Sequence, residues 1–232
     1  MDTDPNVFIW YGVFVFSTVL HEASHALVAY KLGDSTAYLG GQVSLNPLPH
    51  MQREPWGMIL IPLVTLYLIK FPIGFAHIPV DAYWARTYPK KSALVSLAGP
   101  LANLLIVIIA GLLICLFIHL GYLMPPKLCG PHRLVDSVGE GMWSVVATAL
   151  TVFFSLNLLL FMFNMFPFPP MDGGSVLQLF IPKKHMLGYQ NVIYNPAFSI
   201  VGLLVAWQLF EFVYSPLFKF SRDIIYPGMY GW

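Results

Sequence analysis

Three ionisable side chains with the spacing of a metal site lie within five positions of one another: His21, Glu22 and His25, in the sequence His-Glu-Ala-Ser-His. Residues four apart share one face of an α-helix, so both imidazoles can reach a single ion. The glutamate beside the first histidine can then act as a general base toward a water molecule at that ion. This pattern is typical of zinc proteases.

The motif sits inside an apolar run, residues 7–30, which is long enough to span a bilayer. Ionisable groups in a spanning helix cost some kcal/mol each and are functional by default. A shared metal explains why three occur together better than the alternative, a surface helix with a histidine pair. His25 lies eight residues before Gly33, where the run ends. At about 1.5 Å per residue, the site is about 12 Å below one membrane surface.

A third ligand is expected, because a catalytic zinc usually has three protein ligands and one open position. The best candidate is Asp172, in a segment that follows an apolar helix directly and contains three prolines that end it. Gly173 and Gly174 allow the backbone to pass close to a neighbour. The alternative is that Asp172 caps a helix starting near Ser175. With the histidine motif present, we expect the ligand role.

Composition places these residues in a membrane protein. Hydrophobic residues make up 57% of the chain and charged residues 10%, with a mean hydropathy of +0.69. A soluble domain carries roughly 25% charged residues. The net charge of +1 and the lack of any basic run indicate no nucleic-acid partner. The predicted fold is an all-α, multi-pass membrane protein with about five to six spans, five of them read directly as apolar runs: 7–30, 56–73, 92–120, 142–164 and 196–214.

The connections between these runs carry two further predictions. Alternation at Val43-Ser44-Leu45 predicts a short strand or re-entrant element after the first helix. Residues 166–174 are apolar yet rich in proline, which predicts non-helical backbone at membrane depth. Cys115 and Cys129 are expected to be unpaired thiols, with a disulfide as the alternative. If every run crosses the membrane and the N-terminus lies outside, the loops on the two sides carry similar numbers of Lys and Arg, which therefore set no orientation.

The two motifs together, HEASH in the first span and FNMFPFPPMDGG late in the chain, resemble the site-2 protease family of intramembrane zinc proteases. Gly33-Asp34, residues 43–48 and residues 98–103 also resemble compact bacterial members, so the likeness covers most of residues 7–181. The resemblance implies one zinc ion held by His21, His25 and Asp172, with Glu22 as catalytic base. It also implies a three-helix core made by the first, third and fourth spans.

The whole chain, residues 1–232, is then expected to be one membrane protease domain, with residues 196–214 as an additional spanning helix. PDZ and CBS regulatory domains are absent from it. The compact form predicts a bacterial plasma (inner) membrane. Expected partners are the lipid bilayer and a transmembrane-protein substrate.

Three other residues are candidates for contact with substrate or for support of an oxyanion. Gly99 and Asn103 lie four apart in the third span, where helix packing is the alternative role for both. Asn164 lies seven residues after Asn157, on the same face of the fourth span. One of these two asparagines is a candidate to donate to a metal ligand, and interhelical bonding is the alternative.

The predicted function is hydrolysis of peptide bonds in or near transmembrane helices of membrane-protein substrates, as in regulated intramembrane proteolysis. One alternative is a catalytically inactive pseudoprotease that binds membrane partners. A pure binder has no use for Glu22. A zinc transporter is the other alternative. It would need further ligands through the membrane, and only the isolated His119 and Glu211 are available.

Overall fold

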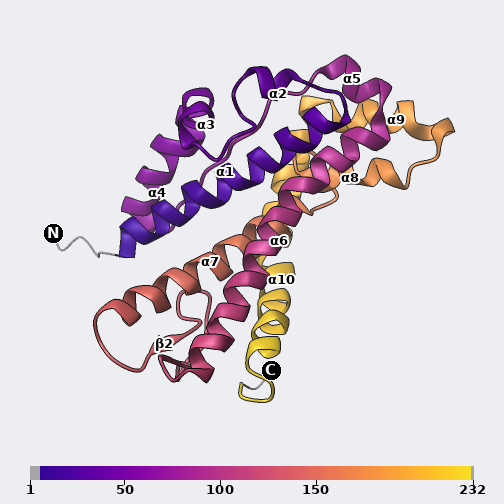
Figure 1. Ribbon diagram of the computed structural model, residues 1–232. Helices are drawn as coiled ribbons and strands as arrows, with labels where there is room; N and C mark the ends of the chain where they lie inside the picture. Colours follow the sequence, from indigo (N-terminus) through magenta and orange to yellow (C-terminus); the bar gives the residue numbers. More distant parts are fainter. Residues whose placement is uncertain (1–5, 231–232) are drawn as a thin grey trace.

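The computed structural model describes residues 6–230; residues 1–5 and 231–232 lie outside the described part. The chain is mostly helical (Figure 1). Its long helices are α1 (Asn6–Leu32), α6 (Pro89–His119), α7 (Met142–Asn164) and α10 (Pro196–Ile225). The shorter elements are α2 (Thr36–Leu39), α3 (Pro47–Arg53), a π-helix (Trp56–Leu60), α4 (Ile61–Ile69), α5 (Ala82–Thr87), α8 (Asp172–Val176), a 3₁₀ turn (Leu177–Leu179) and α9 (Lys183–Ile193).

Within the described residues, four helices are long and apolar enough to cross a membrane: α1, α6, α7 and α10. They coincide with four of the five predicted runs, so the chain is an all-α, multi-pass membrane protein. The run at 56–73 is different, because its helix covers only Trp56–Ile69. Lys70, in the left-handed conformation with φ 60°, ends that helix, and Pro72 cannot continue it.

The three helices expected to form the core do pack together. α6 lies against both α1 and α7, and α1 also contacts α7. Lipid is as apolar as leucine, so close packing and interhelical hydrogen bonds must hold such helices together. Trp10, Phe14 and Leu156 are buried where α1 meets α7. A larger buried cluster joins α6, α7 and α10, and includes Val107, Ile114, Phe154, Leu158, Ala206 and Phe218.

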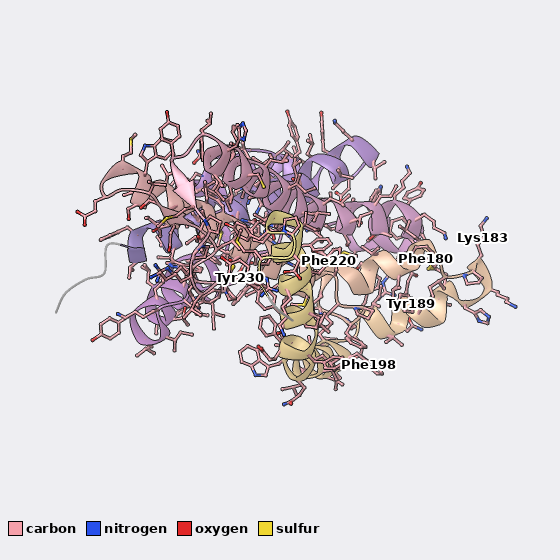
Figure 2. The ribbon with its side chains drawn as sticks, turned by 90° about the horizontal axis from the view of Figure 1, so that it is seen from below. Phe180, Lys183, Tyr189, Phe198, Phe220 and Tyr230 are labelled. Carbon is pink, nitrogen blue, oxygen red and sulfur yellow. The ribbon has the colours of Figure 1, made fainter. Side chains whose placement is uncertain are left out.

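The C-terminal helix α10 covers the side of this core and presents an apolar outer face. Gly202, Ala206, Tyr214, Phe218 and Arg222 are its buried residues. Exposed side chains on other faces include Phe198 and Phe220, both labelled in Figure 2. An exposed apolar stripe on a 30-residue helix is what lipid requires.

The segment between α1 and α6 starts and ends on the same side of the molecule. The Lys91 Nζ, in the first turn of α6, donates to the carbonyl oxygen of Leu32 at the end of α1 at 3.2 Å. Residues 56–69 therefore leave that side, and residues 72–80, which have no regular secondary structure, return to it. The Lys and Arg comparison made from the sequence assumed a full crossing here, and its assignment of loops to sides was wrong.

The predicted strand at Val43–Leu45 was also wrong, because these residues form a bend. Their polar groups are used locally: the Ser44 hydroxyl accepts from the Asn46 N–H, and the Asn46 side chain caps α3. The sheet that does form pairs β1 (Leu123–Met124) with β2 (Asp136–Ser137), antiparallel, in the loop between α6 and α7. Cys115 and Cys129 are free thiols, as expected.

Candidate metal centre

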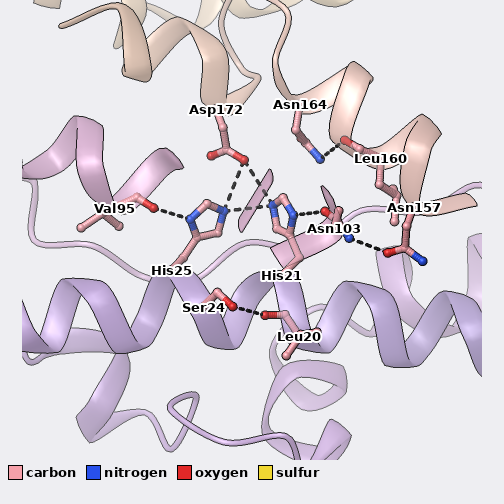
Figure 3. Close-up of polar contacts among 10 residues, drawn as sticks. All are labelled: Leu20, His21, Ser24, His25, Val95, Asn103, Asn157, Leu160, Asn164 and Asp172. Atoms are coloured by element: carbon pink, nitrogen blue, oxygen red, sulfur yellow. Dashed lines mark hydrogen bonds and ion pairs between the residues drawn. The ribbon is translucent and has the colours of Figure 1, made fainter. Parts of the chain in front are cut away.

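His21 and His25 lie one turn apart on α1 and point toward α6 and α8 (Figure 3). Their Nε2 atoms are 2.9 Å apart and their ring planes are nearly perpendicular, at 83°. Both residues are buried, at 6% and 5% exposure. The helical spacing therefore does what the motif predicts and directs two imidazole nitrogens at one point inside the protein.

The Nδ1 atom of each ring makes a hydrogen bond on the side away from the Nε2 atom. The Nδ1 of His25 lies 2.7 Å from the backbone oxygen of Val95 on α6, and the Nδ1 of His21 lies 2.5 Å from the side-chain oxygen of Asn103. A carbonyl oxygen only accepts, so each Nδ1 carries the proton. Each Nε2 is then left with a lone pair. This is the tautomer that a metal-binding histidine needs.

Asn103 is itself oriented by a chain of buried hydrogen bonds that crosses the three core helices. Its amide nitrogen donates to the Asn157 side-chain oxygen on α7 at 2.8 Å. Asn157 in turn donates to the Ser17 hydroxyl on α1 at 2.9 Å and to the Phe153 backbone oxygen at 2.8 Å. Asn103, Asn157 and Ser17 are all fully buried. These bonds fix which amide atom of Asn103 faces His21.

Asp172 approaches the two histidines from α8. Its Oδ2 lies 3.2 Å from His21 Nε2 and 3.3 Å from His25 Nε2. The helix begins at Asp172 itself, and the N-cap Met171 makes no side-chain cap. The alternative of Asp172 capping a helix at Ser175 was therefore wrong. A side chain at Gly173 would run into the backbone of Met165 and Phe166, so glycine is required for this close return of the chain.

Glu22 lies beside the pair on the same helix and is 4% exposed. Ligand atoms of His21, Glu22 and His25 all lie within 4.8 Å of one another. The Oε2 atom of Glu22 is buried and has no hydrogen-bond partner among the described residues. A buried carboxylate oxygen without a donor is costly unless a proton, water or ion serves it.

Gly99 forms the floor of the site. A Cβ placed there would collide with Nε2 of both histidines. Only glycine leaves the space in front of these two nitrogens free. The sequence indicated this residue for contact with substrate or oxyanion support, and the structure places it directly against the imidazoles.

The donor set fits a zinc ion. Nε2 atoms of two imidazoles and one carboxylate oxygen converge, with separations of 2.9 to 3.3 Å. A bound cation would stabilise this convergence of acceptors. Two neutral histidines and one carboxylate are a known ligand set for catalytic zinc, which keeps a further position open.

Asn164 does not belong to this group. Its amide nitrogen donates to the Leu160 oxygen on its own helix at 3.0 Å (Figure 3). Sequence reasoning did not single out Ser17, although its position four residues before His21 places it on the same helix face. The Val95 carbonyl is a backbone group, and no side-chain pattern could have indicated it.

Comparison with known proteins places the chain in a family. The profile of Peptidase family M50 matches residues 10–205. The chain therefore belongs to peptidase family M50, the site-2 proteases.

Two proteins that it resembles are named as zinc metalloproteases. It is 32% identical over 216 residues to "Putative zinc metalloprotease YwhC" of Bacillus subtilis, which covers 91% of this chain and 86% of that protein. It is 28% identical over 204 residues to "Putative zinc metalloprotease Rip2" of Mycobacterium tuberculosis strain H37Rv, covering 84% and 67% respectively. No solved structure gives a significant match.

Proposed function

We propose that this protein is an active intramembrane zinc endopeptidase that hydrolyses peptide bonds in or near transmembrane helices of other membrane proteins. The observation that carries the proposal is the convergence of His21, His25 and Asp172 beside the unpaired carboxylate of Glu22, inside apolar helices. A role in regulated intramembrane proteolysis in a bacterial plasma membrane is part of the same proposal.

His21, His25 and Asp172 would hold the zinc, which when bound supplies a Lewis acid that polarises a peptide carbonyl and acidifies a water molecule. Glu22 accepts a proton from the attacking water through its free carboxylate oxygen. It then delivers that proton to the leaving amine. Asn103 and the Val95 carbonyl hold the two imidazoles in their metal-binding tautomer throughout.

The substrate must unwind locally before it can react, because a helix hides its carbonyls in its own hydrogen bonds. The site lies where α1, α6 and α8 meet, and Asp172 is the most exposed of the proposed ligands, with 19% of its side chain accessible. We expect an unwound substrate to approach from the Asp172 side.

Two measurements test the proposal. Zinc content by mass spectrometry should be about one ion per wild-type chain and much lower in Asp172→Ala. Glu22→Gln should keep the zinc and lose cleavage of membrane-spanning substrates by at least about a hundredfold. Purified wild-type protein that contains no zinc would favour the alternative of a catalytically inactive pseudoprotease. Full cleavage by Glu22→Gln would exclude the mechanism. Zinc uptake into sealed vesicles would support the transporter.

A further inference from the structure

Asp172 differs from the two histidines because a long helix does not carry it. It opens α8, which has only five residues, and a helix this short is not stable by itself. Contacts from other elements must therefore set how far its carboxylate reaches toward His21 and His25. Two such contacts come from α9 and α10, neither of which supplies a proposed metal ligand.

The first contact is a hydrogen bond from Tyr189, a residue of α9 that is labelled in Figure 2. Its hydroxyl donates to the backbone carbonyl oxygen of Gly174 at 2.6 Å. Gly174 follows Asp172 by two residues. Among the described residues, no other side chain from outside residues 172–179 makes a hydrogen bond to the backbone of α8. The bond therefore ties the segment that carries the carboxylate to α9.

α9 is itself fixed to α5, so it can serve as a support. Gln190 is 3% exposed, and its amide nitrogen donates to the backbone oxygen of Arg86 on α5 at 3.1 Å. Met186, four residues earlier on α9, is also buried. At the end of α9, the guanidinium of Arg86 lies 5.0 Å from the centre of the Tyr194 ring. These contacts hold the helix from which Tyr189 projects.

The second contact is the close packing of α10 on the loop that leads to Asp172. A Cβ at Gly202 would collide with the backbone oxygen of Pro169 and would press on the side chain of Phe168. Only glycine therefore allows α10 to lie this close to the loop. The packing restrains the chain three residues before Asp172, and the Tyr189 bond restrains it two residues after.

We propose that Tyr189 is a positioning residue of the metal centre, which acts through the Gly174 carbonyl and sets how closely the Asp172 carboxylate approaches the two histidine rings. The inference rests on the proposed function, because it takes Asp172 as a zinc ligand. Zinc binds carboxylate oxygens over a narrow range of distances, so a small displacement of α8 weakens the site. A residue outside the three core helices then controls the zinc affinity.

Tyr189→Phe tests the proposal, because it removes the hydroxyl and keeps the ring. Competition with a chelator would measure the zinc affinity of the full-length protein in detergent, and we expect about tenfold weaker binding. The matched control is Tyr194→Phe, at the C-terminal end of α9. The Tyr194 hydroxyl is buried and has no hydrogen-bond partner among the described residues, so its removal should leave the zinc affinity unchanged.

A double-mutant cycle separates positioning of Asp172 from a general loosening of the fold. Asp172→Ala lacks the carboxylate that Tyr189 is proposed to position. In that background, Tyr189→Phe should change the residual zinc affinity by less than about twofold. Cobalt in place of zinc gives a visible spectrum that depends on the geometry of the ligands. Tyr189→Phe should shift this spectrum, and Tyr194→Phe should not.

Equal zinc affinities of Tyr189→Phe and Tyr194→Phe would overturn the proposal. So would an equal loss on adding Tyr189→Phe to wild type and to Asp172→Ala, because the hydroxyl would then support the fold without acting on the ligand. Wild-type zinc affinity in Asp172→Ala would overturn both this inference and the proposed function. If wild type holds zinc but cuts no membrane-spanning helix, weaker zinc binding by Tyr189→Phe would uphold the positioning role and count against the protease function alone.

Discussion

The side-chain oxygen of Asn103 lies 2.5 Å from Nδ1 of His21, although the two residues come from different helices. The contact is buried and continues through Asn157 to Ser17. It ties the tautomer of one proposed metal ligand to the packing of α1, α6 and α7.

Replacing Asn103 with alanine should weaken zinc binding by about ten- to a hundredfold, because His21 loses the acceptor that fixes its ring and tautomer. Competition with a chelator would measure the affinity. Asn164→Ala is the matched control, since that amide bonds only within its own helix. Equal zinc affinity of the two variants would show that the bond does not support the metal.

Gly99→Ala should reduce zinc occupancy strongly while the helices remain formed, because the added methyl group collides with both Nε2 atoms. The comparison is Gly111→Ala on the same helix, where a Cβ would meet the Phe154 ring at 3.5 Å and the Ile225 side chain at 3.8 Å, both ordinary contacts. Zinc content would measure occupancy of the site in both variants, and circular dichroism would show whether their helices are formed. Normal zinc in Gly99→Ala would mean that the site lies elsewhere.

Asp34→Ala should lower the free energy of unfolding by about 2 to 3 kcal/mol. This buried carboxylate accepts from the Thr36 N–H at 2.9 Å and the Asp81 N–H at 3.0 Å, and so joins the end of α1 to the start of α5. Asp136→Ala breaks the exposed pair with Arg133, which water screens, and should cost much less. Denaturant titration in detergent would measure the free energy of unfolding of both variants. Equal losses would show that Asp34 does not stabilise the junction of α1 and α5.

Cys129 should be slow to alkylate in the folded protein. Burial raises the pKa of this thiol to about 11, an effect that Asp223 reinforces and Arg222 opposes. Little thiolate is therefore present at pH 8, and the alkylation rate should rise about tenfold per pH unit up to about pH 11. Labelling with iodoacetamide, with the denatured chain as control, measures this. A folded rate equal to the denatured rate at pH 8 would contradict it.

The sequence predicted the spanning helices and the candidate metal ligands, because both depend on the types and spacing of side chains. The apolar runs identified four long helices, and the HEASH and Met-Asp-Gly-Gly segments identified groups that the fold brings within 3.3 Å. The Val43–Leu45 strand was wrong because alternation cannot show that Ser44 and Asn46 satisfy the local backbone instead. The run at 56–73 looked like a crossing because hydropathy does not register the turn at Lys70.

The hydrogen bonds that hold the two histidines could not be predicted from the sequence. Val95 acts through its backbone oxygen, and Asn103 was indicated for contact with substrate, whereas it bonds to a histidine. Both depend on how α6 is rotated against α1, which no local pattern records.

The proposed ligands are also far apart in the order of synthesis. Asp172 follows His25 by about 150 residues, with α6 and α7 between them. At 5–20 residues per second, a ribosome adds Asp172 on the order of 10 s after the histidine pair. The nascent first helix would therefore wait in the membrane without its third ligand, and the catalytic centre can close only after the helices that hold it have been made.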